Sequence, residues 1–234
     1  MAIHPGDIIS YAELCVEEGS NVQRGMNFRI KGQETIILMS IRPGAPYADR
    51  VEENGKVLIY EGHDVPKNQA RIPKAVDQVD RSPIGTLTEN GKFFRAAANY
   101  KEGKDPAELI KVYEKIKKGI WVYNGLFYLV DAWIEKSEGR NVFKFKLLVT
   151  DQTAKIRANN IKKLQDLVHN RIIPTSVKLE VWKRDGGKCV QCGSTDNLHF
   201  DHDVPFAKGG SSLTAANIKL LCARHNLQKS DKIV

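Results

Sequence analysis

Short alternating runs of apolar and polar residues dominate the first 150 residues, and Gly, Pro and Asn separate one run from the next. Alternation of this kind is typical of β-strands with one buried face. The clearest runs lie at residues 35–39, 57–60, 120–123, 127–133 and 142–149. At residues 106–118 the apolar positions recur instead at helical spacing after an Asp-Pro start, which predicts a helix. We therefore expect a mostly β domain in this part of the chain.

The pattern becomes helical after residue 150. Apolar residues from Ile156 to Val168 recur at helical spacing, and the opposite face of this predicted helix is rich in lysine. Further along, the pattern predicts a helix near residues 177–184, a short strand at 198–202 and a helix over 215–227. The last fifty residues therefore form a small mixed domain that is distinct from the β domain.

These elements predict an α+β protein of three parts, with a β domain at residues 1–150, a helical linker at 151–175 and a small domain at 176–234. The net charge of +8 is uneven, because residues 1–150 hold 22 Lys and Arg against 20 Asp and Glu, whereas residues 151–234 hold 14 against 8. A basic end suits a polyanionic partner, since neutralised phosphates release counterions. No apolar run reaches membrane-spanning length and no secretory signal precedes the chain, so we expect a protein of the prokaryotic cytoplasm.

Two pairs of metal-binding residues stand in the small domain. Cys189 and Cys192 form a CxxC pair, and Cys222 and His225 form a CxxH pair. Two such pairs predict a tetrahedral structural zinc site, and a domain of this size needs such a site because it cannot bury a large core. The alternatives are reduced core thiols beside a surface histidine, or a zinc site of three cysteines with His225 on a second metal. Cys15 stands alone and is expected to be an ordinary thiol.

Polar residues suited to phosphodiester hydrolysis lie between and beside these pairs. In order they are Asp201-His202-Asp203-Val204-Pro205, Gly209-Gly210, Asn217, Leu221-Cys222-Ala223-Arg224-His225-Asn226 and Lys229. Over residues 177–233 this order resembles the HNH nuclease family, whose core is a ββα-metal finger. The resemblance implies a metal-dependent DNA endonuclease.

The resemblance to HNH nucleases also implies a role for each matching residue. His202 resembles the general base that takes a proton from the attacking water. Asp201 and Asn226 resemble the ligands of a catalytic divalent ion, Mg²⁺ by default, with Mn²⁺ or Ni²⁺ also accepted. Asn217 resembles the residue that holds the base-bearing loop by hydrogen bonds. The chain departs from the simplest family pattern because Asn226 stands where a histidine is usual, and Lys229 is a candidate phosphate contact.

The β domain carries motifs of its own. They are Tyr60-Glu61-Gly62, Asn68-Gln69, Tyr123-Asn124-Gly125-Leu126-Phe127 and Phe143-Lys144-Phe145. Their order resembles the SRA (YDG) domain, which reads modified cytosine in DNA, although Asn124 stands where the family has its name-giving Asp. The resemblance spans residues 5–149, is strongest in the last third, and implies a curved β-barrel with flanking helices that extrudes the target base.

The resemblance to SRA domains implies a set of base-reading residues. Tyr47 and Tyr60 are candidate stacking partners and Asp49 is a candidate acceptor for the exocyclic amine of cytosine. The motif Tyr60-Glu61-Gly62 adds Glu61 and Gly62, and Arg24 belongs to a polar loop that could probe a groove. The alternatives are core aromatics for the tyrosines, a turn-capping carboxylate for Asp49, and a solvated hairpin tip for the Arg24 loop. His63 has no partner at a useful spacing and receives no role.

Together the two resemblances imply a modification-dependent restriction endonuclease, which reads 5-methylcytosine or 5-hydroxymethylcytosine in double-stranded DNA and cuts nearby. A single HNH site hydrolyses one strand, so we expect a homodimer, at least on DNA. One alternative is an HNH nicking or homing nuclease that ignores base modification. The other is a DNA reader whose finger only binds, although such a finger has no chemical need of Asp201, His202 and Asn226.

Overall fold

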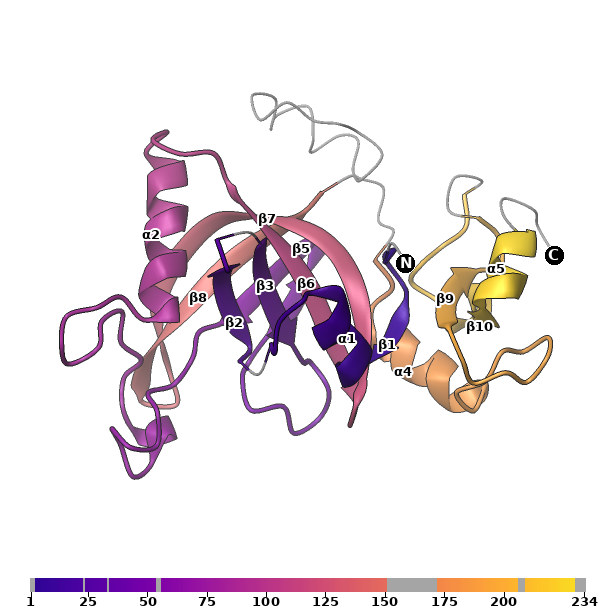
Figure 1. Cartoon of the computed structure of the whole chain (residues 1–234), viewed down its shortest axis with the longest axis horizontal. Coiled ribbons are helices and arrows are strands. Elements are labelled where there is room, and N and C mark those ends of the chain that lie inside the picture. Colours follow the sequence, from indigo (N-terminus) through magenta and orange to yellow (C-terminus); the bar gives the residue numbers. More distant parts are fainter. Residues whose placement is uncertain are drawn as a thin grey trace.

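A large curved sheet and a small finger make up the computed structural model, which describes residues 3–22, 24–32, 34–53, 56–150, 172–205 and 209–229 (Figure 1). The sheet lies in the amino-terminal part and the finger in the carboxyl-terminal part. The linker helix expected at 153–169 falls outside the described residues. Within them, no helix combines the length and the apolar character that crossing a bilayer requires.

The sheet has eight strands. They are β1 (Ile8–Ser10), β2 (Met26–Ile30), β3 (Glu34–Met39), β4 (Arg50–Glu52), β5 (Val57–Glu61), β6 (Glu108–Lys117), β7 (Ile120–Ser137) and β8 (Arg140–Val149). The order is β2-β3-β6-β7-β8-β5-β4, and β1 pairs with β7. All of the predicted strands of this domain are confirmed. The sheet is strongly curved, but among the described residues no pairing joins β2 to β4, so it is open rather than closed into the predicted barrel (Figure 1).

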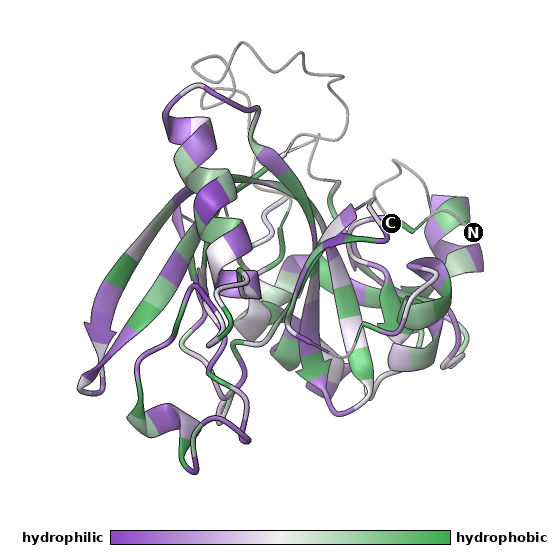
Figure 2. Cartoon of the chain, turned by 60° about the vertical axis from the view of Figure 1, so that its left-hand side comes forward, coloured by the Kyte–Doolittle hydropathy of each residue, from purple (hydrophilic) through white to green (hydrophobic). Residues whose placement is uncertain are grey.

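Two helices accompany the sheet. α1 (Tyr11–Glu17) begins at a capping box formed by Ser10 and Glu13, and α2 (Glu89–Lys101) begins at an N-cap, Thr88, whose side chain accepts a hydrogen bond from Gly91 N. Phe93 and Ala97 of α2 pack into the main core against the sheet. Bands of hydrophobic and hydrophilic residues along the long strands mark the same division between core and solvent (Figure 2). The sequence pattern missed α2 because two of its four buried positions, Asn90 and Gly91, are not apolar.

The helix predicted at residues 106–118 is wrong, because this segment is strand β6. β6 lies between β3 and β7 in the interior of the sheet, and five of its residues are buried. A strand covered on both faces loses the alternation that identifies strands, and its apolar residues can fall at helical spacing by chance. β-branched residues such as Ile110 and Val112 also favour the extended conformation.

The finger contains two helices, two strands and a single 3-10 turn in the described residues. They are α4 (Thr175–Arg184), β9 (Leu198–His202), η4 (Ala215–Asn217), β10 (Ile218–Cys222) and α5 (Ala223–Lys229). The predicted helix near 177–184 and the strand at 198–202 are confirmed. The predicted helix over 215–227 is wrong in its first half, because residues 218–222 pair with β9 and the helix begins only at Ala223. The result is the ββα order expected of an HNH finger.

Candidate active site and base-reading site

The cysteines and the histidine of the two predicted pairs come together at one end of the finger. The ligand atoms of Cys189, Cys192, Cys222 and His225 all lie within 4.8 Å of one another. Cys192 Sγ is 3.8 Å from Cys222 Sγ, and His225 Nδ1 is 3.3 Å from Cys189 Sγ and 3.4 Å from Cys222 Sγ. A tetrahedral zinc ion, with bonds of about 2.3 Å to sulfur and about 2.0 Å to nitrogen, requires edges of roughly 3.5–3.8 Å. The cluster can therefore hold a metal such as zinc, and His225 belongs to it rather than to a second metal.

A tight turn prepares the first pair for this role. Gly193 N donates to Cys189 O (2.8 Å) and Cys189 N donates to Ser194 O (2.8 Å), which closes the chain around Cys192. Burial opposes ionisation of the Cys189 thiol, but hydrogen bonds from the backbone N–H groups of Cys222, Gln191 and Cys192 and from His225 outweigh it. They lower the pKa of Cys189 to about 6. A thiolate at neutral pH is the form that binds zinc.

The Asp-His pair lies where β9 ends. Asp201 and His202 face Lys219 and Ile218 on β10. Both side chains are half-buried, and His202 Nε2 lies 2.7 Å from Ser212 Oγ. This contact orients the imidazole ring from the far side of the loop. Ser212 is a residue that the sequence interpretation missed, because a serine ten positions away carries no motif signal.

Asn217 binds that loop on both sides. Its Oδ1 accepts from Val204 N (2.8 Å), and its Nδ2 donates to Val204 O (3.2 Å) and Ser211 O (3.0 Å). Gly210 lies so close that a Cβ there would be 1.8 Å from Val204 O. These contacts are those of a residue that holds the base-bearing segment in place rather than one that reacts.

The remaining predicted residues of the active site lie on α5, which packs against β9 and β10. Lys229 Nζ donates to Asp201 Oδ2 (2.5 Å) and also to His202 O. Lys229 is buried, so its ammonium points into the site and not outward to a phosphate. Asn226 precedes Lys229 by three residues and therefore shares its helix face, on the side of Asp201.

In the β domain, His63 lies against both predicted stacking tyrosines. The rings of Tyr47 and His63 are stacked with centroids 5.8 Å apart, and Tyr60 Oη lies 3.3 Å from His63 Nε2. Burial lowers the pKa of His63 to about 4, so its ring is neutral at pH 7. Asn90 binds both backbone groups of His63, accepting from N and donating to O at 2.8 Å each. Tyr60 itself is 1% exposed and belongs to the main core, which leaves Tyr47 and His63 as the more accessible rings.

Asp49 lies beside these rings and is 7% exposed. Its carboxylate accepts from Glu61 N (3.0 Å) and Ser40 N (3.2 Å), which joins the start of β4 to β5 and to the end of β3. Burial raises the pKa of Asp49 to about 7, although the two backbone hydrogen bonds act in the opposite direction. Each carboxylate oxygen has two lone pairs, so Asp49 can accept a further donor.

Glu61 and Gly62 have structural contacts beneath this group. Glu61 accepts from buried Lys144 (2.9 Å) and lies 3.5 Å from Arg140. A Cβ on Gly62 would be 2.6 Å from Asn90 Oδ1, so only glycine fits there. Among the described contacts, both residues serve the packing of the domain, and neither has a free side-chain group for a base.

The predicted probing loop lies next to the same group. Arg24 is exposed, and a Cβ on Gly25 would be 2.5 Å from Tyr60 Oη and 2.7 Å from His63 Nε2. Asn27 Nδ2 donates to Arg24 O (2.7 Å) and so closes the turn. The loop therefore lies over the Tyr60–His63 pair, where Arg24 can extend from the molecule.

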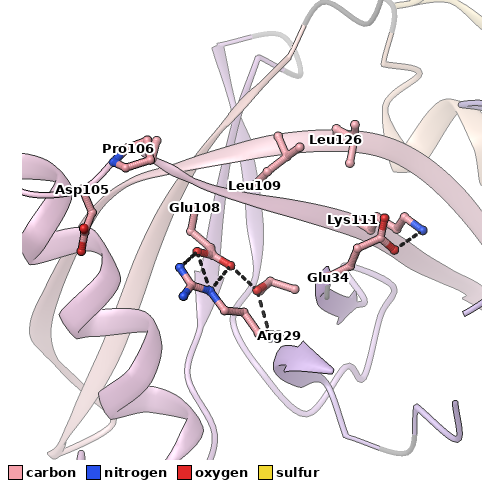
Figure 3. Close-up of a pocket in the computed structure, with 10 residues that line it drawn as sticks. Arg29, Glu34, Asp105, Pro106, Glu108, Leu109, Lys111 and Leu126 are labelled. Atoms are coloured by element: carbon pink, nitrogen blue, oxygen red, sulfur yellow. Dashed lines mark hydrogen bonds and ion pairs between the residues drawn. The ribbon is translucent and has the colours of Figure 1, made fainter. Parts of the chain in front are cut away.

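A cavity of about 410 Å³ lies elsewhere, beside the start of β6 (Figure 3). Four of its five charged residues form two ion pairs, and the fifth, Asp105, accepts a hydrogen bond from Asn99 Nδ2 (2.6 Å). Arg29 binds Glu108 (2.6 Å) and Lys111 binds Glu34 (2.5 Å). Because these pairs satisfy its lining and no predicted site residue contributes to it, we assign the cavity no function.

Comparison with known proteins gives a family match for the finger. Residues 189–232 match the family model of the HNH endonuclease. A search of the curated proteins found no match. Among solved structures, the chain is similar to the SUVH5 SRA domain in complex with hemimethylated CG DNA, at 26% identity over 67% of this chain and 95% of that chain, with a TM-score of 0.47.

Two further solved structures are similar to this chain. SUVH5 SRA bound to fully hydroxymethylated CG DNA has 23% identity over 63% of this chain and 89% of that chain, with a TM-score of 0.42. SUVH6 of Arabidopsis thaliana in complex with SAM has 25% identity over 63% of this chain and 26% of that chain, with a TM-score of 0.39. The finger therefore matches the HNH endonuclease model over residues 189–232, and the β domain before it carries sequence motifs that resemble those of SRA domains in the same order.

Proposed function

We propose that this protein is a modification-dependent DNA endonuclease. Its SRA-like domain binds 5-methylcytosine or 5-hydroxymethylcytosine in double-stranded DNA, and its HNH domain hydrolyses a phosphodiester bond nearby. The observation that carries the proposal is the Asp201–His202 pair at the end of β9, with Asn217 bound to the loop behind it and Asn226 on the facing helix.

In this mechanism His202 takes the proton from the attacking water. A neutral imidazole suits the task near pH 7, and Ser212 orients the ring. Asn217 would hold Val204 and Ser211 in place through its side-chain hydrogen bonds, which would keep His202 close to the scissile phosphate. Positioning of this kind supplies a large share of the rate enhancement in phosphodiester hydrolysis.

Asp201 and Asn226 would hold the catalytic metal. Carboxylate and amide oxygens are hard ligands of the kind that Mg²⁺ prefers, and Mn²⁺ or Ni²⁺ are alternatives. The ammonium of Lys229, held by Asp201 Oδ2 and His202 O, indicates that these oxygens favour a cation. A divalent ion bound there supplies positive charge that neutralises the scissile phosphate and stabilises the leaving oxygen. The Cys189, Cys192, Cys222 and His225 cluster would hold a structural zinc ion.

The reading step would use the rings around His63. A base between two rings needs roughly 3.5 Å on each face, or about 7 Å between the rings. The Tyr47 and His63 centroids are 5.8 Å apart and the rings are nearly parallel, so an extruded base would have to separate them before it could lie between them. Asp49 would accept from the exocyclic amine of cytosine, and Arg24 would contact the DNA from the neighbouring loop. Base extrusion costs a few kcal/mol, which stacking and edge hydrogen bonds offset.

Two copies of the chain would be needed for a double-strand break, since each copy has one HNH site. We therefore propose a homodimer on DNA. Sedimentation of the protein with a duplex that carries marks on both strands tests this expectation, and a 1:1 complex that still cuts both strands would contradict it.

The proposal is tested by cleavage, with Mg²⁺, of one DNA prepared with cytosine, 5-methylcytosine or 5-hydroxymethylcytosine, beside a His202→Ala variant. We expect cutting of modified DNA only, and a rate lower by about 10²–10⁴-fold in the variant while DNA binding persists. Equal cutting of all three substrates would support a nicking or homing nuclease that ignores modification. Cutting that persists unchanged in His202→Ala would contradict the assigned base.

A further inference from the structure

The finger shares one hydrophobic core with the β domain, which is called the reading domain from here on because the proposed function assigns it the recognition of the base. From the sheet, Ile116 and Val122 join this core, and from the finger Val177, Val181 and the strand residues of β9 and β10 join it. Val181 and Val122 are fully buried. Domains that move independently are usually separated by smaller and more polar contacts, so a continuous apolar core indicates that the two domains form a single unit.

A buried polar cluster crosses the same boundary. Lys178 of α4 donates to Glu114 Oε2 of β6 (2.7 Å) and to Asn124 Oδ1 of β7 (2.6 Å), while Asn124 Nδ2 donates to Glu114 Oε2 (3.0 Å). Thr175 donates to the other oxygen of Glu114. The side chains of Lys178 and Glu114 are each 2% exposed. Burial opposes ionisation of Glu114, but Lys178, Asn124 and Thr175 outweigh it and lower its pKa.

The amide at position 124 fits this cluster in a way that an aspartate cannot. Asn124 accepts from the ammonium with one atom and donates to the carboxylate with the other. An ionised aspartate has no donor, and it would place a second buried negative charge beside Glu114 with only one lysine for both. The departure from the SRA pattern at Asn124 therefore has a physical reason in the packing of the finger.

A second contact joins the finger to the residues just before β1. Phe200 N donates to Gly6 O (3.2 Å), and His199 Nδ1 lies 2.5 Å from Asp7 Oδ1. β1 pairs with β7 at its other edge, so hydrogen bonds connect the two-stranded ribbon of the finger to the large sheet. Two separate contacts, one through α4 and one through β9, prevent the finger from turning about either of them.

We propose that this docking holds the active site at a fixed position relative to the base-reading site, so that the enzyme cuts at one fixed distance from the modified base. Lys178 and Asn124 are positioning residues. They hold the finger on the sheet, so the position of the modified base determines which phosphodiester bond is cut. The inference rests on the proposed function. The inference predicts a narrow distribution of cut positions around the modified base. The proposed function alone predicts cleavage near that base but not how widely the cuts are spread.

The test uses a long duplex with one modified cytosine, and its cleaved ends are mapped to the nucleotide on both strands. We expect the full chain to cut each strand within a window of one or two nucleotides. Lys178→Met leaves the buried carboxylate of Glu114 without its ammonium partner. Asn124→Asp places a second negative charge beside that carboxylate. Both variants should spread the cuts over a window several-fold wider, while the affinity for modified DNA stays within twofold. Lys183→Met, on the exposed side of the same helix, is the matched control and should cut as the parent does.

If a single variant does not fold, the double variant Glu114→Gln with Lys178→Met takes its place. It removes both charges of the pair, so no unpaired charge is left buried. It should widen the window because the apolar core alone then positions the finger. Scattered cuts by the parent protein, or an unchanged window in every variant, would overturn the inference while leaving a modification-dependent nuclease intact. Cutting that ignores the mark would instead overturn the proposed function.

Discussion

The finger and the reading domain stabilise their site residues by different means. In the finger, two five-residue strands and a seven-residue helix position the Asp-His pair, and four ligand atoms within 4.8 Å of one another close the structure. In the reading domain, an eight-stranded sheet positions the site, and buried ion pairs such as Lys144–Glu61 connect strands distant in sequence. The finger therefore offers a cluster that could hold a metal ion and packs against the β domain, whereas the β domain has a large core of its own.

The largest expected effect is the loss of the metal in the finger. Structural zinc contributes an apparent 10–16 kcal/mol in isolated finger peptides, on the order of the whole stability of a domain. We expect Cys222→Ser, or treatment with a strong chelator, to abolish cleavage and to change the fluorescence of Trp182, which packs on the finger core. Cys15→Ser, at the free thiol on α1, is the control and should retain bound zinc and activity. A Cys222→Ser protein with full metal content would contradict this assignment.

Breaking the buried ion pair of the reading domain is expected to have the next largest effect. Lys144→Met removes the nearest cation of buried Glu61 (2.9 Å) but leaves Arg140 at 3.5 Å, so the loss is that of one hydrogen bond to a charged group, about 1.5–3 kcal/mol. We expect the free energy of unfolding, measured with urea, to fall by this amount. Lys146→Met, two residues along the same strand and half-buried, should change it by less than about 1 kcal/mol. Equal losses in the two variants would show that the ion pair contributes nothing specific.

A smaller effect is expected on recognition. Stacking of a base on an aromatic ring contributes about 1–3 kcal/mol, so Tyr47→Ala should weaken binding of modified DNA by roughly 5–150-fold. His63→Ala removes the other ring of the pair and should weaken binding in the same way. Tyr128→Ala on β7 serves as the control, and fluorescence anisotropy with inactive His202→Ala protein supplies the affinity. Unchanged binding in Tyr47→Ala would place the base elsewhere.

The smallest net effect is expected in the pH dependence of the parent protein's stability, because the contributions of Asp49 and His63 act in opposite senses and partly cancel. The pKa of Asp49 in the folded protein is raised to about 7. Its contribution to the free energy of unfolding is therefore complete below about pH 4 and is lost as the pH rises to 7. The folded pKa of His63 is lowered to about 4, so its contribution increases as the pH rises from about 4 to 6.5. Each slope is at most roughly 1.4 kcal/mol per pH unit.

Urea unfolding at pH 4.5, 5.5 and 6.5 separates the two slopes. Relative to the parent protein, Asp49→Asn should make stability increase more steeply with pH, and His63→Gln should make it decrease. Parallel pH curves for all three proteins would contradict both assignments.

The sequence predicted the residues of the finger better than those of the reading site. In the finger the interacting residues are close in sequence, whereas in the reading site they are far apart. The metal cluster consists of two pairs with three-residue spacing, and Asp201 and His202 are adjacent, so local spacing was sufficient. The role of His63 depends on Tyr47 and on Asn90, which is 27 residues away, and no spacing rule connects them. The runs of β3, β5, β7 and β8 were predicted as strands, whereas β6 was mistaken for a helix because its apolar residues fall at helical spacing.

The docking of the finger was also beyond sequence reasoning. Lys178 and Asn124 are 54 residues apart and lie in different domains. No local spacing pattern could therefore predict that their side chains are in contact. The sequence did show that Asn124 departs from the SRA pattern. Only the structure gives a reason for it, since the amide must both accept from Lys178 and donate to Glu114.

The most direct test of modification-dependent cleavage is the ratio of initial cutting rates on two otherwise identical duplexes, one with 5-methylcytosine and one with cytosine. It is measured for the parent protein and for Tyr47→Ala under the same Mg²⁺ concentration. We expect a ratio well above ten in the parent that falls toward one in Tyr47→Ala, because the reading site selects the substrate of the HNH site. A ratio near one in both proteins would contradict this, and the β domain would then bind DNA without reading modification.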